Sequence, residues 1–214
     1  MKKKIKAVIF DLDGTLIDSM PYWKGMAGKY LRSLGIAPHE DVEEEIKTFT
    51  FRQSAQYFRE KYGVRLSTAE IIDGMNKIIG EHYKYDIPLK TGVEDLLKRL
   101  SDRGIKMCVA TASERIHAVS ALTRLGVIDC FSRIFACGEL NCDKTEPVVY
   151  RAALSYFETE RGETAVFEDT LHALLTAKKD GFVTVAVFDG CESDQVGMKK
   201  AADYYAADLS SFEF

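Results

Sequence analysis

Several features that mark specialised protein classes are scarce in this 214-residue sequence. It has five cysteines, an odd number at irregular spacing, which argues against a disulfide framework and against a Cys/His zinc site. The formal net charge is only −4, so neither nucleic acid nor an anionic membrane surface is indicated as a partner. No apolar run approaches the ~20 residues of a membrane span. The lysines at residues 2–6 precede too few apolar residues for a signal peptide, so we expect a cytoplasmic protein.

Short apolar runs at regular intervals are the main pattern that is present. From Gly92 onward they alternate with segments of helical periodicity. Strands are expected at residues 5–10, 105–110, 133–136, 165–167 and 183–187, with an edge strand at 204–206. Helices are expected at residues 93–103, 114–125, 145–160, 171–180 and 196–202. This alternation predicts an α/β fold, a doubly wound (Rossmann-like) parallel sheet.

Residues 18–87 interrupt this pattern, because they contain no clear strand. Helices are expected at 20–34, 39–49, 52–62 and 67–85, the last opening with a capping box from Ser67 to Glu70. Pro88 marks the exit from the segment, since the residue before a proline avoids helical geometry. We therefore expect a helical domain of about four helices at 18–87. It would be inserted into a core formed by residues 1–17 and 88–214.

Two acids one residue apart, Asp11 and Asp13, follow the first predicted strand directly, and Gly14 allows a sharp turn after them. Open α/β sheets bind their ligands in the crevice at the carboxyl ends of the strands. The period of two in a strand would point both carboxylates to the same side. The alternative is a strand followed by an ordinary Asp-Gly turn.

Hydroxyl and amide groups follow a second predicted strand at Thr111-Ala112-Ser113. A hydroxyl together with backbone N–H groups at the start of a helix can bind phosphate. The alternative is that one hydroxyl only caps the next helix. We expect both, with Ser113 as the N-cap and Thr111 turned towards the phosphate.

Charged residues occupy two further positions of this kind. Glu168 and Asp169 end a predicted strand, where they could be partners of a helix dipole. If they lie opposite Asp11, a site for a divalent metal is favoured, and Mg²⁺ prefers such oxygen ligands. Lys144 lies in a loop before a helix, either as a solvated charge or as the cation that balances these acids and a bound phosphate.

Taken in order, Asp11-x-Asp13, Thr111, Lys144 and Glu168-Asp169 resemble the four motifs of the haloacid dehalogenase superfamily. The resemblance spans nearly the whole chain. The inserted helical segment resembles the cap of the subgroup that contains β-phosphoglucomutase and many small phosphatases, among them phosphoglycolate phosphatases. The resemblance implies a phosphatase that acts on a small-molecule phosphate ester such as a sugar phosphate.

The resemblance also implies a role for each motif residue. Asp11 would be the nucleophile that forms an aspartyl-phosphate, and Asp13 the acid that protonates the leaving group and later activates water. Thr111 and the Ala112 N–H would hold phosphate oxygens, and Lys144 would stabilise the negative charge. The implied metal is Mg²⁺, bound by Asp11, Asp13 through its main-chain carbonyl, Asp169 and Glu168.

Departures from the family pattern leave alternatives open. Asp13 argues against dehalogenases and phosphonatases, which lack it. Tyr22-Trp23 lacks the histidine found in β-phosphoglucomutases, which disfavours a phosphosugar mutase. Lys90-Thr91-Gly92 stands where relatives have Pro-Gly.

Arg52 could bind a second phosphate or a carboxylate of the substrate, or simply begin a helix at the surface. A non-catalytic binding protein on the same fold is the remaining alternative, and a monomer is the default expectation.

Overall fold

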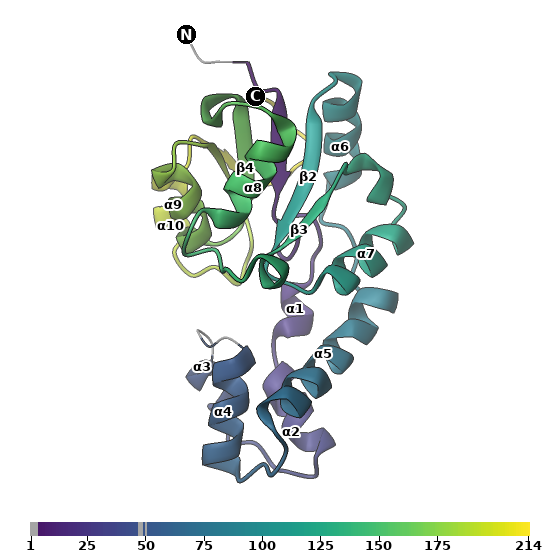
Figure 1. Cartoon of the computed structure of the whole chain (residues 1–214), viewed down its shortest axis with the longest axis vertical. Helices are drawn as coiled ribbons and strands as arrows, with labels where there is room; N and C mark the ends of the chain where they lie inside the picture. Colours follow the sequence, from purple (N-terminus) through teal and green to yellow (C-terminus); the bar gives the residue numbers. More distant parts are fainter. Residues whose placement is uncertain (1–3, 47–48, 50) are drawn as a thin grey trace. The chain divides into compact units, whose positions relative to one another are not determined.

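The structure is a computed structural model, and it describes residues 4–46, 49 and 51–214. The chain forms two compact units (Figure 1). Met1–Ser19 and Ile87–Phe214 make an α/β unit, and Met20–Asp86 make a helical unit. Across the described residues, no helix has both the length and the apolar composition needed to cross a bilayer.

A single sheet of six parallel strands is the centre of the α/β unit. The strands are β1 (Ala7–Phe10), β2 (Lys106–Thr111), β3 (Ile134–Ala136), β4 (Thr164–Glu168), β5 (Val183–Val187) and β6 (Tyr204–Ala206). Their order is β3-β2-β1-β4-β5-β6, so the chain changes winding direction between β1 and β4. The predicted doubly wound parallel sheet is confirmed, and its switch point lies where such folds bind ligands.

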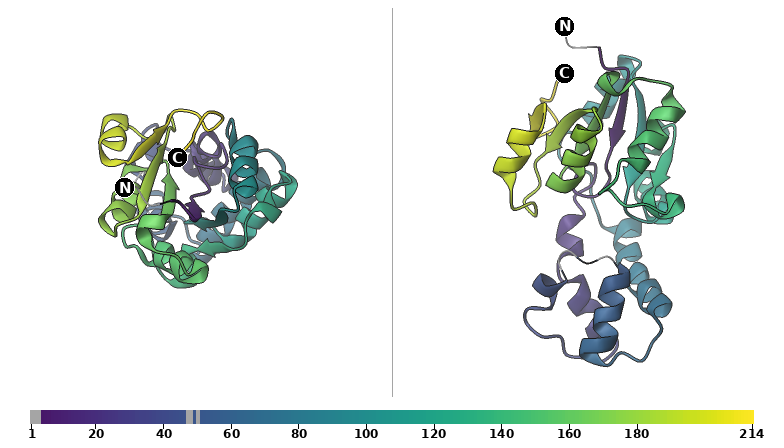
Figure 2. Two further views of the ribbon diagram at one scale, coloured as in Figure 1. Left: turned by 90° about the horizontal axis from the view of Figure 1, so that it is seen from above. Right: turned by 60° about the vertical axis from the view of Figure 1, so that its left-hand side comes forward.

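Helices pack on both faces of this sheet (Figure 2). They are α6 (Val93–Asp102), α7 (Arg115–Arg124), α8 (Val148–Phe157), α9 (Leu171–Lys179) and α10 (Gln195–Ala201). Three short 3₁₀ helices accompany them: η1 (Ile128–Cys130), η2 (Cys137–Leu140) and η3 (Arg161–Glu163). In Figure 1, α8 lies in front of the sheet, where it contacts β1, β2 and β3.

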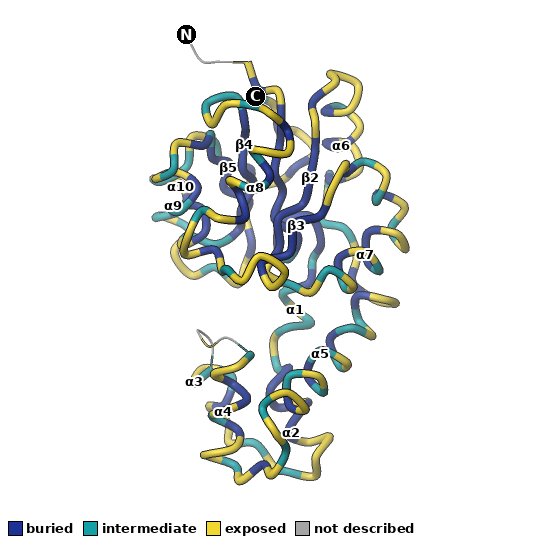
Figure 3. Tube along the Cα trace, in the orientation of Figure 1, coloured by how far each residue is buried: buried dark blue, intermediate teal, exposed yellow. Residues whose placement is uncertain are grey.

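Successive side chains along each strand point to opposite faces of the sheet, so the core is divided between the two faces. Ala7 and Ile9 of β1 belong to one cluster with Tyr150 and Phe157 of α8. Every residue of β1 and β4 is buried, and the strands form a dark-blue layer in Figure 3. Burial on both faces explains why these strands appear in the sequence as unbroken apolar runs.

The helix expected at 145–160 is shorter than predicted, since α8 begins at Val148 and ends at Phe157. Before it, the Asp143 carboxylate accepts the backbone N–H of Thr145 at 2.8 Å, which holds that stretch as a turn. After it, Glu158 adopts a left-handed conformation with φ of 55°. The periodicity of the sequence does not report either local feature.

The helical unit contains α1 (Met20–Trp23), α2 (Met26–Ser33), α3 (Val42–Glu45), α4 (Phe51–Tyr62) and α5 (Thr68–Tyr85). Its core joins Tyr30 and Leu31 of α2, Phe58 of α4 and Met75 of α5. The predicted capping box is confirmed, because Ser67 accepts the Glu70 N–H while the Glu70 carboxylate accepts the Ser67 N–H.

Two helix predictions in this unit are wrong. The expected helix 20–34 is divided into α1 and α2, because Gly25 takes a left-handed φ of 79° that a continuous helix excludes. Within 39–49, the described residues are helical only at Val42–Glu45, and Lys47 and Thr48 lie outside the described residues. The described part of the unit therefore has five helices, of 4 to 18 residues, instead of about four.

Candidate active site

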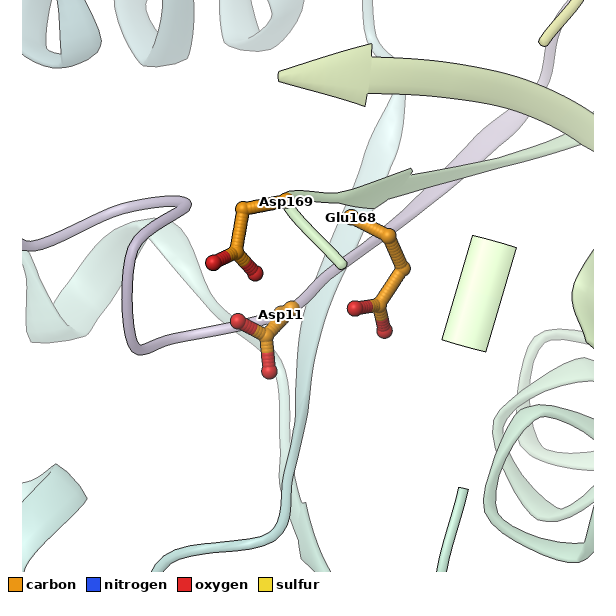
Figure 4. A group of neighbouring side chains, drawn as sticks. All are labelled: Asp11, Glu168 and Asp169. Atoms are coloured by element: carbon orange, nitrogen blue, oxygen red, sulfur yellow. The ribbon is translucent and has the colours of Figure 1, made fainter. Parts of the chain in front are cut away.

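Three carboxylates meet at the switch point of the sheet, and Figure 4 shows them converging. Asp11 follows β1, and its backbone N–H donates to the Phe167 carbonyl of β4 at 2.9 Å, which extends the pairing of the two strands. Glu168 ends β4 and Asp169 follows it. All three side chains are buried, and each offers a carboxylate oxygen within 4.8 Å of the others. Residues more than 150 positions apart in the sequence thus share one site.

Lys144 joins two of these acids. Its Nζ donates to Asp11 Oδ1 and, at 2.7 Å, to Glu168 Oε1. Only 6% of the side chain is exposed, so this lysine is not the solvated charge of the alternative interpretation. A buried ammonium between two carboxylates can hold both in place and offset part of their charge.

Glu168 has a second donor that the sequence analysis missed. The Tyr150 hydroxyl donates to Glu168 Oε1 at 2.6 Å, and Tyr150 is fully buried on α8. The carboxylate is therefore held by a lysine and a tyrosine at one oxygen. In the sequence Tyr150 occupies a core position of a helix, and nothing there distinguishes it from an aromatic residue that only packs.

Asp13 binds a different partner, because the Ser113 hydroxyl donates to its Oδ2 at 2.6 Å. The prediction that Ser113 caps the following helix is wrong. The N-cap position belongs to Glu114, which makes no capping hydrogen bond with its side chain. Ser113 lies one residue too early for the cap, and its hydroxyl points across to the loop after β1 instead.

Thr111 ends β2 and is fully buried. Its Oγ1 accepts the Ser113 N–H at 2.9 Å, and a hydroxyl that accepts one bond keeps its own proton for donation. Ala112 lies between them and is exposed. Arg52 belongs to the helical unit, where its side chain is exposed on α4, and a substrate contact by it stays a prediction.

Burial and crowding of like charges dominate the electrostatics of the site. Burial raises the pKa of Asp11 to about 7; the Lys144 charge opposes this, while Glu168 and Asp13 add to it. Burial also raises the pKa of Asp169 well above its ordinary value, with Asp11 and Glu168 contributing. For Lys144, burial alone would lower the pKa, but the two carboxylates outweigh it and raise the pKa.

These observations test whether a divalent cation fits the site. Three carboxylates face one ammonium, so two negative charges remain uncompensated when all are ionised. Burial and mutual repulsion raise the pKa values of Asp11 and Asp169, so a second cation in the cluster would be favoured over two unbalanced charges. The ligand atoms are all oxygens, the donors that Mg²⁺ prefers. The residues present fit such an ion.

The metal-free protein is expected to lose stability as the pH rises from 5 to 8. Up to about pH 7, folded Asp11 holds a proton that the unfolded chain, with a pKa of 3.8, has already lost. Asp11 alone contributes about 3 kcal/mol to this loss. Urea unfolding in chelator measures it, and Mg²⁺ at pH 8 is expected to restore stability.

Asp11→Asn is the control for that experiment, and its stability should depend less on pH. Burial lowers the pKa of His117 below its ordinary value of 6.5. This histidine therefore makes the folded protein more stable as the pH rises towards 6.5, the opposite of the Asp11 effect. It is present in both proteins, so the difference between them reports the Asp11 carboxyl group together with its effect on the pKa of Asp169. If the stability of the wild type increased steadily from pH 5 to 8, the raised pKa assigned to Asp11 would be contradicted.

The family follows from this arrangement together with the sequence. Residues 8–187 match the model of the haloacid dehalogenase-like hydrolases. The chain belongs to this family, and the resemblance predicted from the four motifs is confirmed. The predicted class of enzyme, a haloacid dehalogenase-type phosphatase, is confirmed as well.

Several characterised relatives are similar over most of their length. The validoxylamine A 7'-phosphate phosphatase of Streptomyces hygroscopicus subsp. limoneus is 27% identical over 186 residues, which covers 85% of each chain. The phosphorylated carbohydrates phosphatase of Thermotoga maritima is 25% identical over 181 residues, covering 83% of this chain and 82% of that protein. The β-phosphoglucomutase of Bacillus subtilis is 27% identical over 200 residues, covering 87% of this chain and 84% of the mutase.

Solved structures share the fold. The crystal structure of CbbY from Rhodobacter sphaeroides in complex with phosphate superposes with a TM-score of 0.82 at 21% identity, covering 97% of this chain and 96% of that one. The β-phosphoglucomutase of Clostridium difficile gives a TM-score of 0.75 at 20% identity, covering 98% and 94%.

Proposed function

We propose that this protein is a Mg²⁺-dependent phosphatase that hydrolyses a small organic phosphomonoester, such as a sugar phosphate, through an aspartyl-phosphate intermediate. The observation that carries the proposal is the buried group of Asp11, Glu168 and Asp169 around the Lys144 ammonium at the switch point of the sheet. One relative is named as a phosphatase of phosphorylated carbohydrates and another as a validoxylamine A 7'-phosphate phosphatase, which supports a small phosphate ester as substrate.

Asp11 is the proposed nucleophile. Its carboxylate attacks phosphorus in line with the leaving oxygen, and an Asp11–phosphorus bond replaces the phosphorus–oxygen bond of the ester. Lys144 holds this carboxylate in a fixed position and offsets charge on the phosphoryl oxygens. Asp11, Asp169, Glu168 and the main-chain carbonyl of Asp13 would hold the metal. When bound, Mg²⁺ offsets the negative charge, so that one anion can approach another.

Proton transfer is assigned to Asp13. It gives a proton to the departing alkoxide and later takes one from the water that hydrolyses the aspartyl-phosphate. The bond from Ser113 holds one oxygen of this carboxyl group, which fixes its direction. Thr111 and the Ala112 N–H are the proposed ligands of the non-bridging phosphate oxygens.

The helical unit is the proposed cap domain, with residues 18–87 inserted into a catalytic core of residues 1–17 and 88–214. Arg52 on α4 is the proposed contact for a second anionic group of the substrate. The proposal includes a cytoplasmic monomer whose partners are small phosphate esters, without nucleic acid or a membrane.

A phosphosugar mutase is the second candidate, favoured by 27% identity to the β-phosphoglucomutase of Bacillus subtilis. It would transfer the phosphoryl group from Asp11 back to another hydroxyl of the sugar instead of to water. Incubation with a sugar 1-phosphate and a trace of the bisphosphate separates the two. A phosphatase releases inorganic phosphate, whereas a mutase yields the 6-phosphate without net release.

The test of the proposed function is phosphate release from a panel of sugar, nucleotide and short-chain organic phosphates. We expect release with Mg²⁺ and at least a hundredfold less in excess chelator, because the uncompensated acids repel the phosphate dianion. Release that is independent of metal would contradict the assigned chemistry. A folded protein that releases phosphate from no ester would leave the mutase or a binding protein.

A further inference from the structure

Lys90 makes three polar contacts within the α/β unit. Its Nζ donates to the Gly14 carbonyl at 2.6 Å, to the Phe188 carbonyl at 2.7 Å and to Asp189 Oδ2 at 2.8 Å. Gly14 directly follows Asp13, and Phe188 directly follows β5. One ammonium group thus connects the loop after β1 to the end of β5.

An ammonium group has three N–H donors and no acceptor, and each donor of Lys90 has a partner in the protein. The Lys90 side chain is 16% exposed and the Asp189 side chain 5%. A lysine in this state has no donor left for a phosphate oxygen. Lys90 therefore acts on the protein itself and not as a ligand of the substrate.

The backbone of Lys90 is also fixed. Its N–H donates to the Leu16 carbonyl at 3.0 Å, which pairs this segment with the loop that carries Asp13. Two residues later, Gly92 has φ of 82°, and a Cβ there would lie 2.1 Å from the Ser210 nitrogen. The close packing of Gly92 against the Ser210 backbone and the bond to Leu16 limit the movement of this segment, from which the Lys90 side chain extends.

The partner acid lies near the active site as well. Asp189 is close enough to Asp169 for its charge to raise the pKa of that carboxyl group. Its other oxygen, Oδ1, accepts the Cys191 N–H at 2.9 Å. The Lys90 ammonium therefore does two things: it neutralises Asp189, a further buried acid beside the acidic cluster, and it holds the Gly14 carbonyl.

We propose that Lys90 is a positioning residue for the proton-transfer group: it holds the loop at Gly14 against the end of β5 and thereby fixes the direction of Asp13. This inference rests on the proposed phosphatase function. The proposed phosphate ligands Thr111, Ala112 and Lys144 lie outside this loop, whereas the Asp13 carbonyl proposed for Mg²⁺ lies within it, so rates are compared at saturating Mg²⁺. Loss of Lys90 should therefore slow both steps that use Asp13, protonation of the leaving alkoxide and activation of water, and leave phosphate binding almost unchanged.

The leaving group provides the test. An alkoxide needs a proton from Asp13 when it departs, whereas p-nitrophenolate leaves without one. We expect Lys90→Met to lower the first-turnover rate for the best alkyl phosphate about 30-fold, since small displacements of catalytic groups cost up to about 10². For p-nitrophenyl phosphate the loss of the first-turnover rate should be threefold or less, and inhibition by inorganic phosphate should stay within about twofold of wild type.

Three variants serve as controls. Lys90→Arg keeps the charge and the donors, and should restore the alkyl phosphate rate to within about threefold of wild type. Asp189→Asn leaves Lys90 two carbonyl partners, and should cost less than Lys90→Met. Lys98→Met removes an exposed lysine of α6 that pairs with Asp102, and should behave as wild type. An equal loss on both esters, or no loss for Lys90→Met, would overturn the proposal.

Hydrogen exchange separates failure of this inference from failure of the proposed function. The Gly14 N–H donates to the Ile17 carbonyl at 2.9 Å, and the Leu16 N–H to the Leu12 carbonyl at 2.9 Å. Lys90→Met should increase exchange at these amides at least tenfold relative to Lys98→Met, whether or not any ester is hydrolysed. Unchanged exchange would refute the loop-holding role even in an active enzyme, and an inactive wild type would refute only the phosphatase.

Discussion

Asp11→Asn is expected to lower kcat for phosphate release at least about 10⁴-fold, because the amide cannot act as the nucleophile. Asparagine has nearly the same shape and still offers an oxygen to Lys144, so the fold and the Lys144 contact should be retained. The loss should therefore come from the chemistry and not from unfolding. Continuous release of phosphate from the best ester, followed for hours at high enzyme concentration, measures the residual rate.

Rapid quenching supplies the matching direct measurement. Wild-type protein mixed with substrate should contain a phosphoryl group that hydroxylamine removes, as expected for an acyl phosphate, and Asp11→Asn should contain none. Asp102→Asn makes the same chemical change at an exposed position of α6 and should keep full activity. If Asp11→Asn retains a tenth of the activity, Asp11 is not the nucleophile.

Lys144→Met is expected to lower kcat about 10³-fold at pH 7. The substitution leaves Asp11 and Glu168 buried without their shared cation. In the metal-free wild type the Lys144 charge lowers the pKa of Asp11 against the effect of burial, so its loss raises that pKa above about 7 and makes the proton a stronger competitor of Mg²⁺ for Asp11. Asp11 would then carry a proton at neutral pH, and a protonated carboxyl group is a poor nucleophile.

The pH profile distinguishes this effect from general damage to the site. At limiting Mg²⁺, where the proton and the metal compete for Asp11, the residual rate of Lys144→Met should increase from pH 7 to pH 9, while the wild-type rate levels off near pH 7 to 8. Lys179→Met removes an exposed lysine of α9 and should follow the wild-type profile. A Lys144→Met profile with the same shape as that of the wild type would show that Lys144 does not set the pKa of Asp11.

Local sequence patterns were sufficient for the strands of the α/β unit. The strands β5 (Val183–Val187) and β6 (Tyr204–Ala206) lie where the sequence places them. They were predictable because a strand buried on both faces needs an apolar run of a few residues with turn signals on either side. The helical unit was less predictable, since the break at Gly25 depends on a backbone angle that helical periodicity does not encode.

For the candidate site, the sequence predicted which residues would carry the chemistry and placed them at the ends of strands or in the loops that follow. Asp11, Asp13, Glu168 and Asp169 follow apolar runs, and carboxyl ends of parallel strands share one edge of a sheet. Lys144 was identified by its place in the order of motifs, because a lysine in a loop has no local feature that predicts burial.

Only the tertiary structure decided the partners of these residues. The contacts of Lys144 with Asp11, of Ser113 with Asp13 and of Lys90 with Gly14 join positions 133, 100 and 76 residues apart. Such pairs depend on strand order and on the direction in which side chains leave the backbone, which periodicity within one element does not contain. The sequence by itself therefore predicted the candidate reacting groups, and the packing of strands and loops determined what holds them in place.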